Sequence, residues 1–141
     1  MKEYRTYSPE ETEALGETLA AGLQGGEVLA CFGGMGMGKT AFARGLARGL
    51  GSDDAVSSPT FALVHEYRGK IPLYHFDMFR VSSWEDLYST GFFDYLDTGA
   101  VLLIEWSENI EDALPKDAIR IRFSRGEEEN QRVIQVSSLE E

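Results

Sequence analysis

The chain has 141 residues and a mass of 15.7 kDa, the size of one domain. Its 13 Lys and Arg against 24 Asp and Glu leave a formal charge of −11, which repels nucleic-acid phosphates and argues against stand-alone nucleic-acid binding. The single cysteine, Cys31, excludes an internal disulfide and a cysteine-rich metal site. No apolar run could span a bilayer and no secretory signal is readable, so we expect a cytoplasmic protein with a single domain over residues 1–141.

The N-terminal part predicts a strand followed by an amphipathic helix. Residues 3–7 alternate weakly, as strands do. Ser8 is expected to cap the helix, Pro9 to occupy its first position and Glu11 to close a capping box. An apolar stripe at spacing four gives the helix its core face, made of Leu15, Leu19 and Leu23.

The remaining elements alternate between strands and helices. Residues 28–32 are wholly apolar, which predicts a strand buried on both faces. A helix is expected from about Lys39 to Leu50, and another from Ser82 or Ser83. The other expected strands cover residues 61–67, 73–76, 101–106, 118–123 and 132–136. This order predicts an α/β fold with a mixed parallel and antiparallel central sheet flanked by helices, and residues 127–141 as an acidic hairpin strand and tail.

A glycine-rich segment at residues 33–40 fits G-x-x-x-x-G-K-[ST] in full, between a strand and a helix. Glycines let consecutive backbone N–H groups surround phosphates, and the new helix presents its positive end to them. Lys39 is expected to reach the β- and γ-phosphates, and the Thr40 hydroxyl to ligate Mg²⁺. We therefore predict a P-loop NTPase-like domain. Its expected nucleotide-binding residues are Gly33, Gly34, Met35, Gly36, Met37, Gly38, Lys39, Thr40, Ala41 and, beyond the loop, Trp106.

The expected nucleotide is ATP. Guanine-specific P-loop proteins usually read the base with an Asn-Lys-x-Asp loop, and neither Asn109 nor Asn130 precedes a lysine. Two acids end apolar strands and are candidates to hold Mg²⁺ or to activate water: Asp77 and Glu105. Either of them could take either role.

A hydroxyl-rich segment fixed by a proline, Ser57-Ser58-Pro59-Thr60-Phe61, lies between the loop and these acids. It could contact the γ-phosphate as a switch, although a plain turn is the simpler interpretation. We expect both histidines, His65 and His75, to be structural. Among these residues and the loop, we expect Asp77, Glu105 and Lys39 to be catalytic.

Four motifs occur in order: the loop at 33–40, Ser58-Pro59-Thr60, His75-Phe76-Asp77-Met78-Phe79-Arg80 and Ile104-Glu105-Trp106-Ser107-Glu108. Together they resemble the bacterial TsaE family, the small ATPase of tRNA threonylcarbamoyladenosine biosynthesis. The resemblance covers about residues 8–115, and the last three motifs are not general P-loop features.

The resemblance implies a P-loop domain that binds ATP and Mg²⁺ and hydrolyses ATP weakly alone. It also implies that the protein acts together with the TsaB–TsaD pair. In that complex, hydrolysis of ATP to ADP would reset the partners between turnovers, and the partners would make most of the contacts with tRNA. By motif position, Lys39 and Thr40 hold phosphate and Mg²⁺, and Glu105 is the second Mg²⁺ ligand. Asp77 becomes a catalytic or supporting acid. Thr60 belongs to the switch loop and joins Asp77, Glu105 and Lys39 as an expected catalytic residue.

Two other functions fit the loop motif. A small-molecule P-loop kinase needs a lid of clustered arginines, and the arginines beyond the loop helix are scattered along the chain. A non-catalytic nucleotide-dependent switch would only control docking to a protein. Hydrolysis in Asp77→Ala and Glu105→Ala separates the switch from the ATPase.

Overall fold

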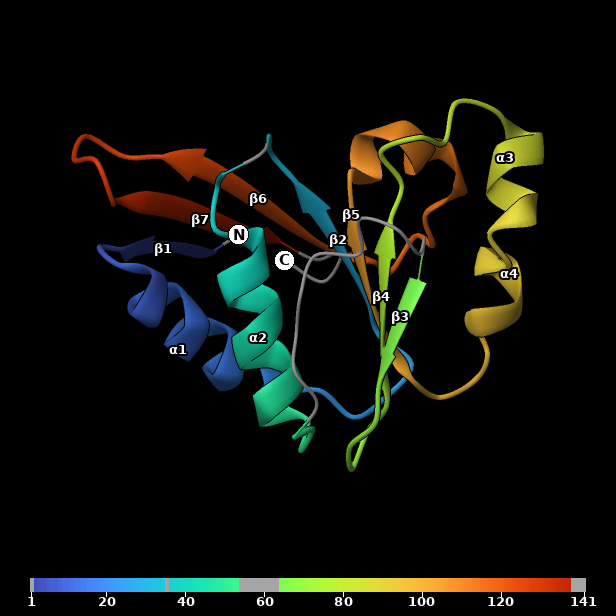
Figure 1. The fold of residues 1–141 in the computed structure, drawn as a ribbon, viewed down its shortest axis with the longest axis horizontal. Helices are drawn as coiled ribbons and strands as arrows, with labels where there is room; N and C mark the ends of the chain where they lie inside the picture. The colour runs from blue at the N-terminus through green and yellow to red at the C-terminus, as the bar shows by residue number, and fades with distance from the viewer. Residues whose placement is uncertain (1, 35, 54–63, 138–141) are drawn as a thin grey trace.

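The computed structural model describes residues 2–34, 36–53 and 64–137, which form one seven-stranded sheet with helices on both faces (Figure 1). The strands are β1 (Lys2–Thr6), β2 (Val28–Phe32), β3 (Val64–Tyr67), β4 (Leu73–Asp77), β5 (Val101–Glu105), β6 (Ile119–Arg125) and β7 (Arg132–Ser137). The helices are α1 (Pro9–Ala20), α2 (Lys39–Gly49), α3 (Trp84–Ser89), α4 (Phe92–Tyr95) and the 3-10 helix η1 (Ser107–Ala113). Within the described ranges, no helix has the length and apolar character that a membrane crossing requires.

The sheet is mixed, as the sequence predicts. Its strand order is β1-β7-β6-β2-β5-β4-β3. The central strands β6, β2, β5 and β4 run parallel. At the two sides, β3 pairs antiparallel with β4 and β7 with β6, and β1 then pairs antiparallel with β7. The carboxyl ends of β2, β4 and β5 therefore meet at one edge, where ligands of open α/β sheets bind.

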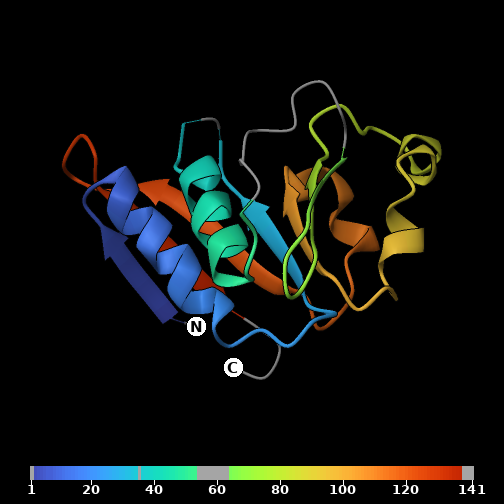
Figure 2. The same cartoon turned by 60° about the horizontal axis from the view of Figure 1, so that its bottom comes forward.

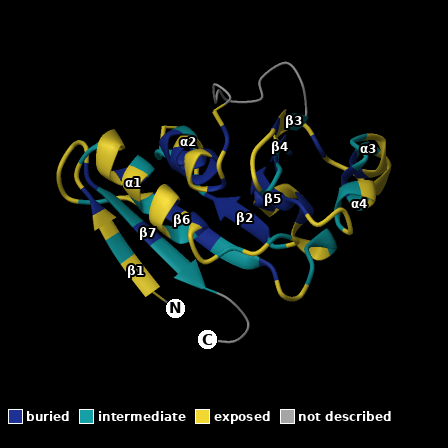
Figure 3. Cartoon of the chain, turned by 90° about the horizontal axis from the view of Figure 1, so that it is seen from below, coloured by how far each residue is buried: buried dark blue, intermediate teal, exposed yellow. Residues whose placement is uncertain are grey.

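Two layers of helices explain why β2 is wholly apolar and β5 is apolar up to its last residue, Glu105. All residues of β2 and β5 are buried, and Figure 3 shows β2 in dark blue, whereas β1 at the edge of the sheet is largely exposed. Phe42 and Leu46 of α2 pack on one face of the sheet. Leu87 of α3, Phe92 of α4 and Ile110 of η1 pack on the other, so the helices lie in separate layers (Figure 2). A strand covered on both faces has no reason to alternate polar and apolar residues.

The start of α1 is nearly as expected. The Ser8 hydroxyl accepts a hydrogen bond from the Glu11 N–H at 3.1 Å, with Pro9 in the first turn. The reciprocal bond differs from a capping box, because the Glu11 carboxylate accepts from Tyr7 N and not from Ser8 N. The short elements α4 and η1 have no counterpart among the predicted elements. The predicted strand at 61–67 is seen as β3, and residues 61–63 lie outside the described ones.

The most deeply buried residues of α1 are not the leucines of the predicted apolar stripe. Its fully buried residues are Thr12, Gly16 and Ala20, while the three leucines are only partly buried against the core. The reason is the close approach of α1 to α2. A Cβ on Gly45 of α2 would collide with the backbone carbonyl of Glu13, and one on Gly16 would collide with that of Phe42. Glycines, and not leucines, make the contact between these helices.

We predict that Gly45→Ala destabilises the protein by about 1–3 kcal/mol, because the obstructing atoms are backbone and the helices must move apart. Thermal unfolding measured by circular dichroism would show a midpoint lowered by several degrees. Gly22→Ala is the matched control, since a Cβ there would make an ordinary 3.7 Å contact with Leu19 O. Equal midpoints for the two variants would contradict the packing argument.

Candidate functional site

The glycine-rich segment joins β2 to α2 at the carboxyl edge of the sheet, in the predicted strand–loop–helix context. Gly33, Gly36 and Gly38 have φ of 130°, 75° and 93°, a region that favours glycine. Gly38 is the N-cap of α2 and offers no side chain to its first N–H groups. These groups are therefore left to bind an anion.

Lys39 begins α2 and its side chain turns back across the loop. Its Nζ donates to the Gly33 carbonyl at 2.7 Å and lies 4.0 Å from Glu105 Oε1. It also lies 4.9 Å from the centre of the Trp106 ring. Only 6% of Lys39 is exposed, so its charge is held in place at the loop.

The two predicted acids lie side by side. Asp77 and Glu105 are register partners at the ends of the parallel strands β4 and β5. Glu105 is 6% exposed, and its Oε2 lies 2.6 Å from His75 Nε2. Asp77 is half-buried, and its Oδ1 accepts from Phe79 N at 2.9 Å. The two neighbouring acids therefore have different contacts. Glu105 faces the loop lysine, whereas Asp77 accepts a hydrogen bond from the turn after β4.

The other predicted residues take different positions. Thr40 and Ala41 follow Lys39 in the first turn of α2, and Ala41 is buried. Gly34 is exposed, whereas Met37 is partly buried and packs against the core. Met35 and the switch segment with Thr60 lie outside the described residues.

His75 is structural, as expected, but its position gives it a further part. It is fully buried in β4, and because a carboxylate can only accept, its Nε2–H donates to Glu105. Its Nδ1 is buried with no hydrogen-bond partner. One signal was present in the sequence: alternate residues of a strand share a face, so His75 lies on the same face as Asp77.

Trp106 turns the chain from β5 into η1. Its φ of 59° and ψ of 42° make it the only non-glycine residue with positive φ in the ranges 2–34, 36–53 and 64–137. Its ring packs against Phe79, with centroids 4.9 Å apart, and lies beside Lys39. The turn therefore places an aromatic wall at the loop.

Three polar residues that the sequence did not single out hold the site together. Glu108 Oε2 accepts from Gly33 N at 3.1 Å. Asn109 Nδ2 donates to Met78 O at 2.8 Å, which ties η1 to the turn after Asp77. Arg132 of β7 donates from Nη2 to Gly36 O at 3.2 Å. Glu108 lies in a recognised motif, whereas nothing in the sequence connects Arg132 with the loop.

Cys31 lies in β2, close to the site, but it is unsuited to chemistry. Burial, and then the negative charge of Glu105, raise the pKa of its thiol far above the usual range. A thiol that is buried and has a raised pKa is poorly suited to act as a nucleophile.

A model of the family described as "Threonylcarbamoyl adenosine biosynthesis protein TsaE" matches residues 6–134. The chain belongs to the TsaE family. It is 41% identical over 131 residues to the TsaE protein of Bacillus subtilis, covering 91% of this chain and 81% of the relative. It is 36% identical over 114 residues to the TsaE protein of Treponema pallidum, covering 81% and 84% of the two chains. The resemblance inferred from the four motifs is confirmed.

The fold is also that of a solved structure. The crystal structure of Bacillus subtilis YdiB superimposes with a TM-score of 0.84 at 34% identity. The match covers 98% of this chain and 85% of YdiB. The predicted P-loop NTPase-like fold is therefore confirmed along with TsaE membership.

Under the ATPase function proposed below, we predict that His75→Leu lowers the turnover number for ATP hydrolysis about 10–100-fold, because it removes the donor that orients the Glu105 carboxylate. The KM for ATP should stay within about threefold, since the hydrogen bond of His75 goes to Glu105 and not to the loop backbone. His75→Gln keeps an N–H donor and should recover part of the turnover. A higher KM for ATP together with the lower turnover number, and no recovery in the glutamine variant, would mean that His75 serves folding alone.

Proposed function

We propose that the chain is an ATPase that supports the threonylcarbamoyladenosine modification of tRNA. It binds ATP and Mg²⁺ at the loop, hydrolyses ATP weakly alone, and acts with the TsaB and TsaD proteins in the cytoplasm. Membership of a family named for threonylcarbamoyl adenosine biosynthesis supports the pathway. The geometry of the loop supports the chemistry.

One observation carries the proposal: a buried ammonium and a buried carboxylate face each other at the mouth of a phosphate-binding loop. Lys39 Nζ is 4.0 Å from Glu105 Oε1, beyond hydrogen-bond distance, while its bond to Gly33 O fixes its direction. The ammonium neutralises charge on the β- and γ-phosphates, and the loop N–H groups hold their oxygens.

Glu105 and Thr40 fit a Mg²⁺ ion. His75 occupies one oxygen of Glu105, and the other faces the loop without a bond to Lys39. The described residues contain no cluster of three or more His, Cys, Asp or Glu suited to a metal. A hydroxyl and one carboxylate suit Mg²⁺, which usually completes its shell with phosphate and water. When bound, Mg²⁺ neutralises charge that develops on the phosphates.

Asp77 is the candidate to orient or deprotonate the attacking water. It stands next to Glu105 in register, and its side chain is partly exposed to solvent. Its bond from Phe79 N holds one oxygen and leaves the other for a water molecule. The Lys39 ammonium meanwhile neutralises the phosphate oxygens. Asp77 would thus act on the attacking water and Lys39 on the phosphate that the water attacks.

The chain is the ATPase subunit, and hydrolysis resets the TsaB–TsaD pair between turnovers. The test measures phosphate release from Mg²⁺-ATP by the purified chain, alone and with TsaB and TsaD from the same organism. We expect slow release alone and faster release with both partners. Unchanged release with the pair would contradict the partner-stimulated role, and phosphate transfer to a metabolite would favour a kinase.

A further inference from the structure

Negative charge gathers on the helical layer opposite α1 and α2. Residues 81–115 contain eight Asp and Glu and no Lys or Arg, while Arg80 and Lys116 flank them. The acids are Glu85, Asp86, Asp94, Asp97, Glu105, Glu108, Glu111 and Asp112. All but Glu105, which is buried in the site, belong to α3, α4, η1 or the turns between them. One layer therefore carries most of the net charge of −11.

The same layer exposes aromatic side chains. Four large hydrophobic residues of the described chain are exposed, and three of them, Phe79, Trp84 and Tyr88, lie on α3 or in the turn that leads towards it. Trp84 stacks on Phe93 of α4 with ring centroids 6.4 Å apart, so it is held with 52% of its surface exposed. Fixed, exposed aromatic rings are typical of the energetic centre of a protein interface.

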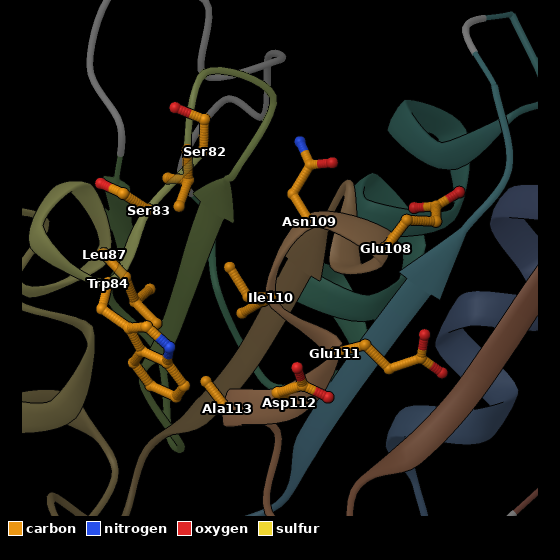
Figure 4. A pocket seen from close by; sticks show the side chains of 11 residues that line it. Ser82, Ser83, Trp84, Leu87, Glu108, Asn109, Ile110, Glu111, Asp112 and Ala113 are labelled. Carbon is orange, nitrogen blue, oxygen red and sulfur yellow. The ribbon is translucent and has the colours of Figure 1, made fainter.

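Between α3 and η1 lies a groove of about 320 Å³ (Figure 4). Its walls include Ser82, Trp84, Leu87, Ile110, Asp112 and Ala113. Glu108 and Glu111 also border it, but their carboxylates bond Gly33 N and Arg120 and point away from Trp84. Asp112 is exposed, with no ion pair among the described residues.

We infer that the face formed by α3, α4 and η1 is a docking surface for a protein segment that carries lysine or arginine beside aliphatic side chains. The groove accepts an aliphatic side chain between Trp84 and Ile110. A cation can lie over the exposed Trp84 ring or pair with Glu85 and Asp112. Nucleic acid is disfavoured because its phosphates meet the negative charge of this face.

The surface is connected to the nucleotide site. η1 forms one wall of the groove and also carries Glu108, which bonds Gly33, and Asn109, which bonds the turn after Asp77. A segment that presses on η1 therefore acts on both ends of the site. The identity of the partner as TsaB–TsaD rests on the proposed function, whereas the position and chemistry of the surface do not.

The test compares two charge-reversed variants of the full chain. Glu85→Lys with Asp112→Lys changes the docking surface, and Glu127→Lys with Glu129→Lys changes net charge equally on the exposed β6–β7 turn. The probe is a short fluorescein-labelled peptide of alternating lysine and leucine, followed by anisotropy. We expect the surface variant to bind about tenfold more weakly than wild type and the control to stay within about twofold. Equal weakening in both would overturn the inference.

A second arm uses the TsaB–TsaD pair, with interferometry against the same variants and Trp84→Ala. We expect the surface variants to lose about tenfold or more in affinity while each variant alone hydrolyses ATP as wild type does. If wild type fails to bind the pair, the proposed partner is wrong and the peptide still decides the surface. Self-association lost only in the surface variant, with no peptide binding by wild type, would make the face a contact between copies and overturn the inference.

Discussion

Glu105→Gln is expected to lower the rate of ATP hydrolysis at least about 100-fold, because partners that merely support metal ligands already contribute 10–100-fold. Glutamine keeps the size of the side chain and its contact with His75 but removes the charge that faces Lys39 and would hold Mg²⁺. Phosphate release across a Mg²⁺ titration measures the effect. The half-saturating Mg²⁺ concentration should rise together with the loss of rate.

Two further variants make this result specific. Asp77→Asn should also slow hydrolysis, but it should leave the Mg²⁺ requirement unchanged if Asp77 acts on water. Glu10→Gln, an exposed acid at the start of α1, makes the same chemical change far from the site and should have no effect. A shifted Mg²⁺ requirement in Asp77→Asn and not in Glu105→Gln would reverse the two roles.

Lys39→Ala is expected to weaken ATP binding about 10–100-fold, the usual contribution of a charged hydrogen bond to phosphate. The loss should be larger for ATP than for ADP, because the ammonium serves the γ-phosphate as well as the β-phosphate. Titration calorimetry with each nucleotide measures both affinities. The substitution also leaves Glu105 without the positive charge it faces across 4.0 Å.

Arg44→Ala supplies the control for Lys39→Ala. Arg44 is an exposed residue of the same helix, so its loss changes net charge by the same amount. Its ATP affinity should stay within about twofold, since exposed charges are well screened. If both variants bind ATP as wild type does, Lys39 does not contact the phosphates.

Sequence patterns predicted the central elements well where one physical cause dominates. Burial on both faces makes β2 wholly apolar and β5 apolar up to Glu105, and both runs were expected to form strands. The pairing of β1 with β7 was not predictable, because it joins opposite ends of the chain. The leucines expected on the core face of α1 do pack against the core but are only partly buried. The closest contact of α1 with α2 is a backbone approach that depends on Gly16 and Gly45, and the leucine spacing does not encode it.

Some residues of the site could also be predicted from sequence patterns, and others could not. The loop motif predicts the position of Lys39, and the ends of apolar strands point to Asp77 and Glu105, which are neighbours in register. Glu108 and Arg132 reach the loop from elements distant in sequence. Their contacts depend on how η1 and β7 pack, and no local pattern encodes that packing.

The backbone at Trp106 sets stability against function. A tryptophan in the left-handed region costs of order 1 kcal/mol, which a glycine would not. The chain nevertheless has at this corner the bulkiest side chain, and its ring lies against Lys39 and Phe79. Replacing Trp106 by glycine would relieve this strain, but it would also remove the ring that lies beside Lys39. Greater stability at this turn would therefore impair the site that the Trp106 ring helps to form.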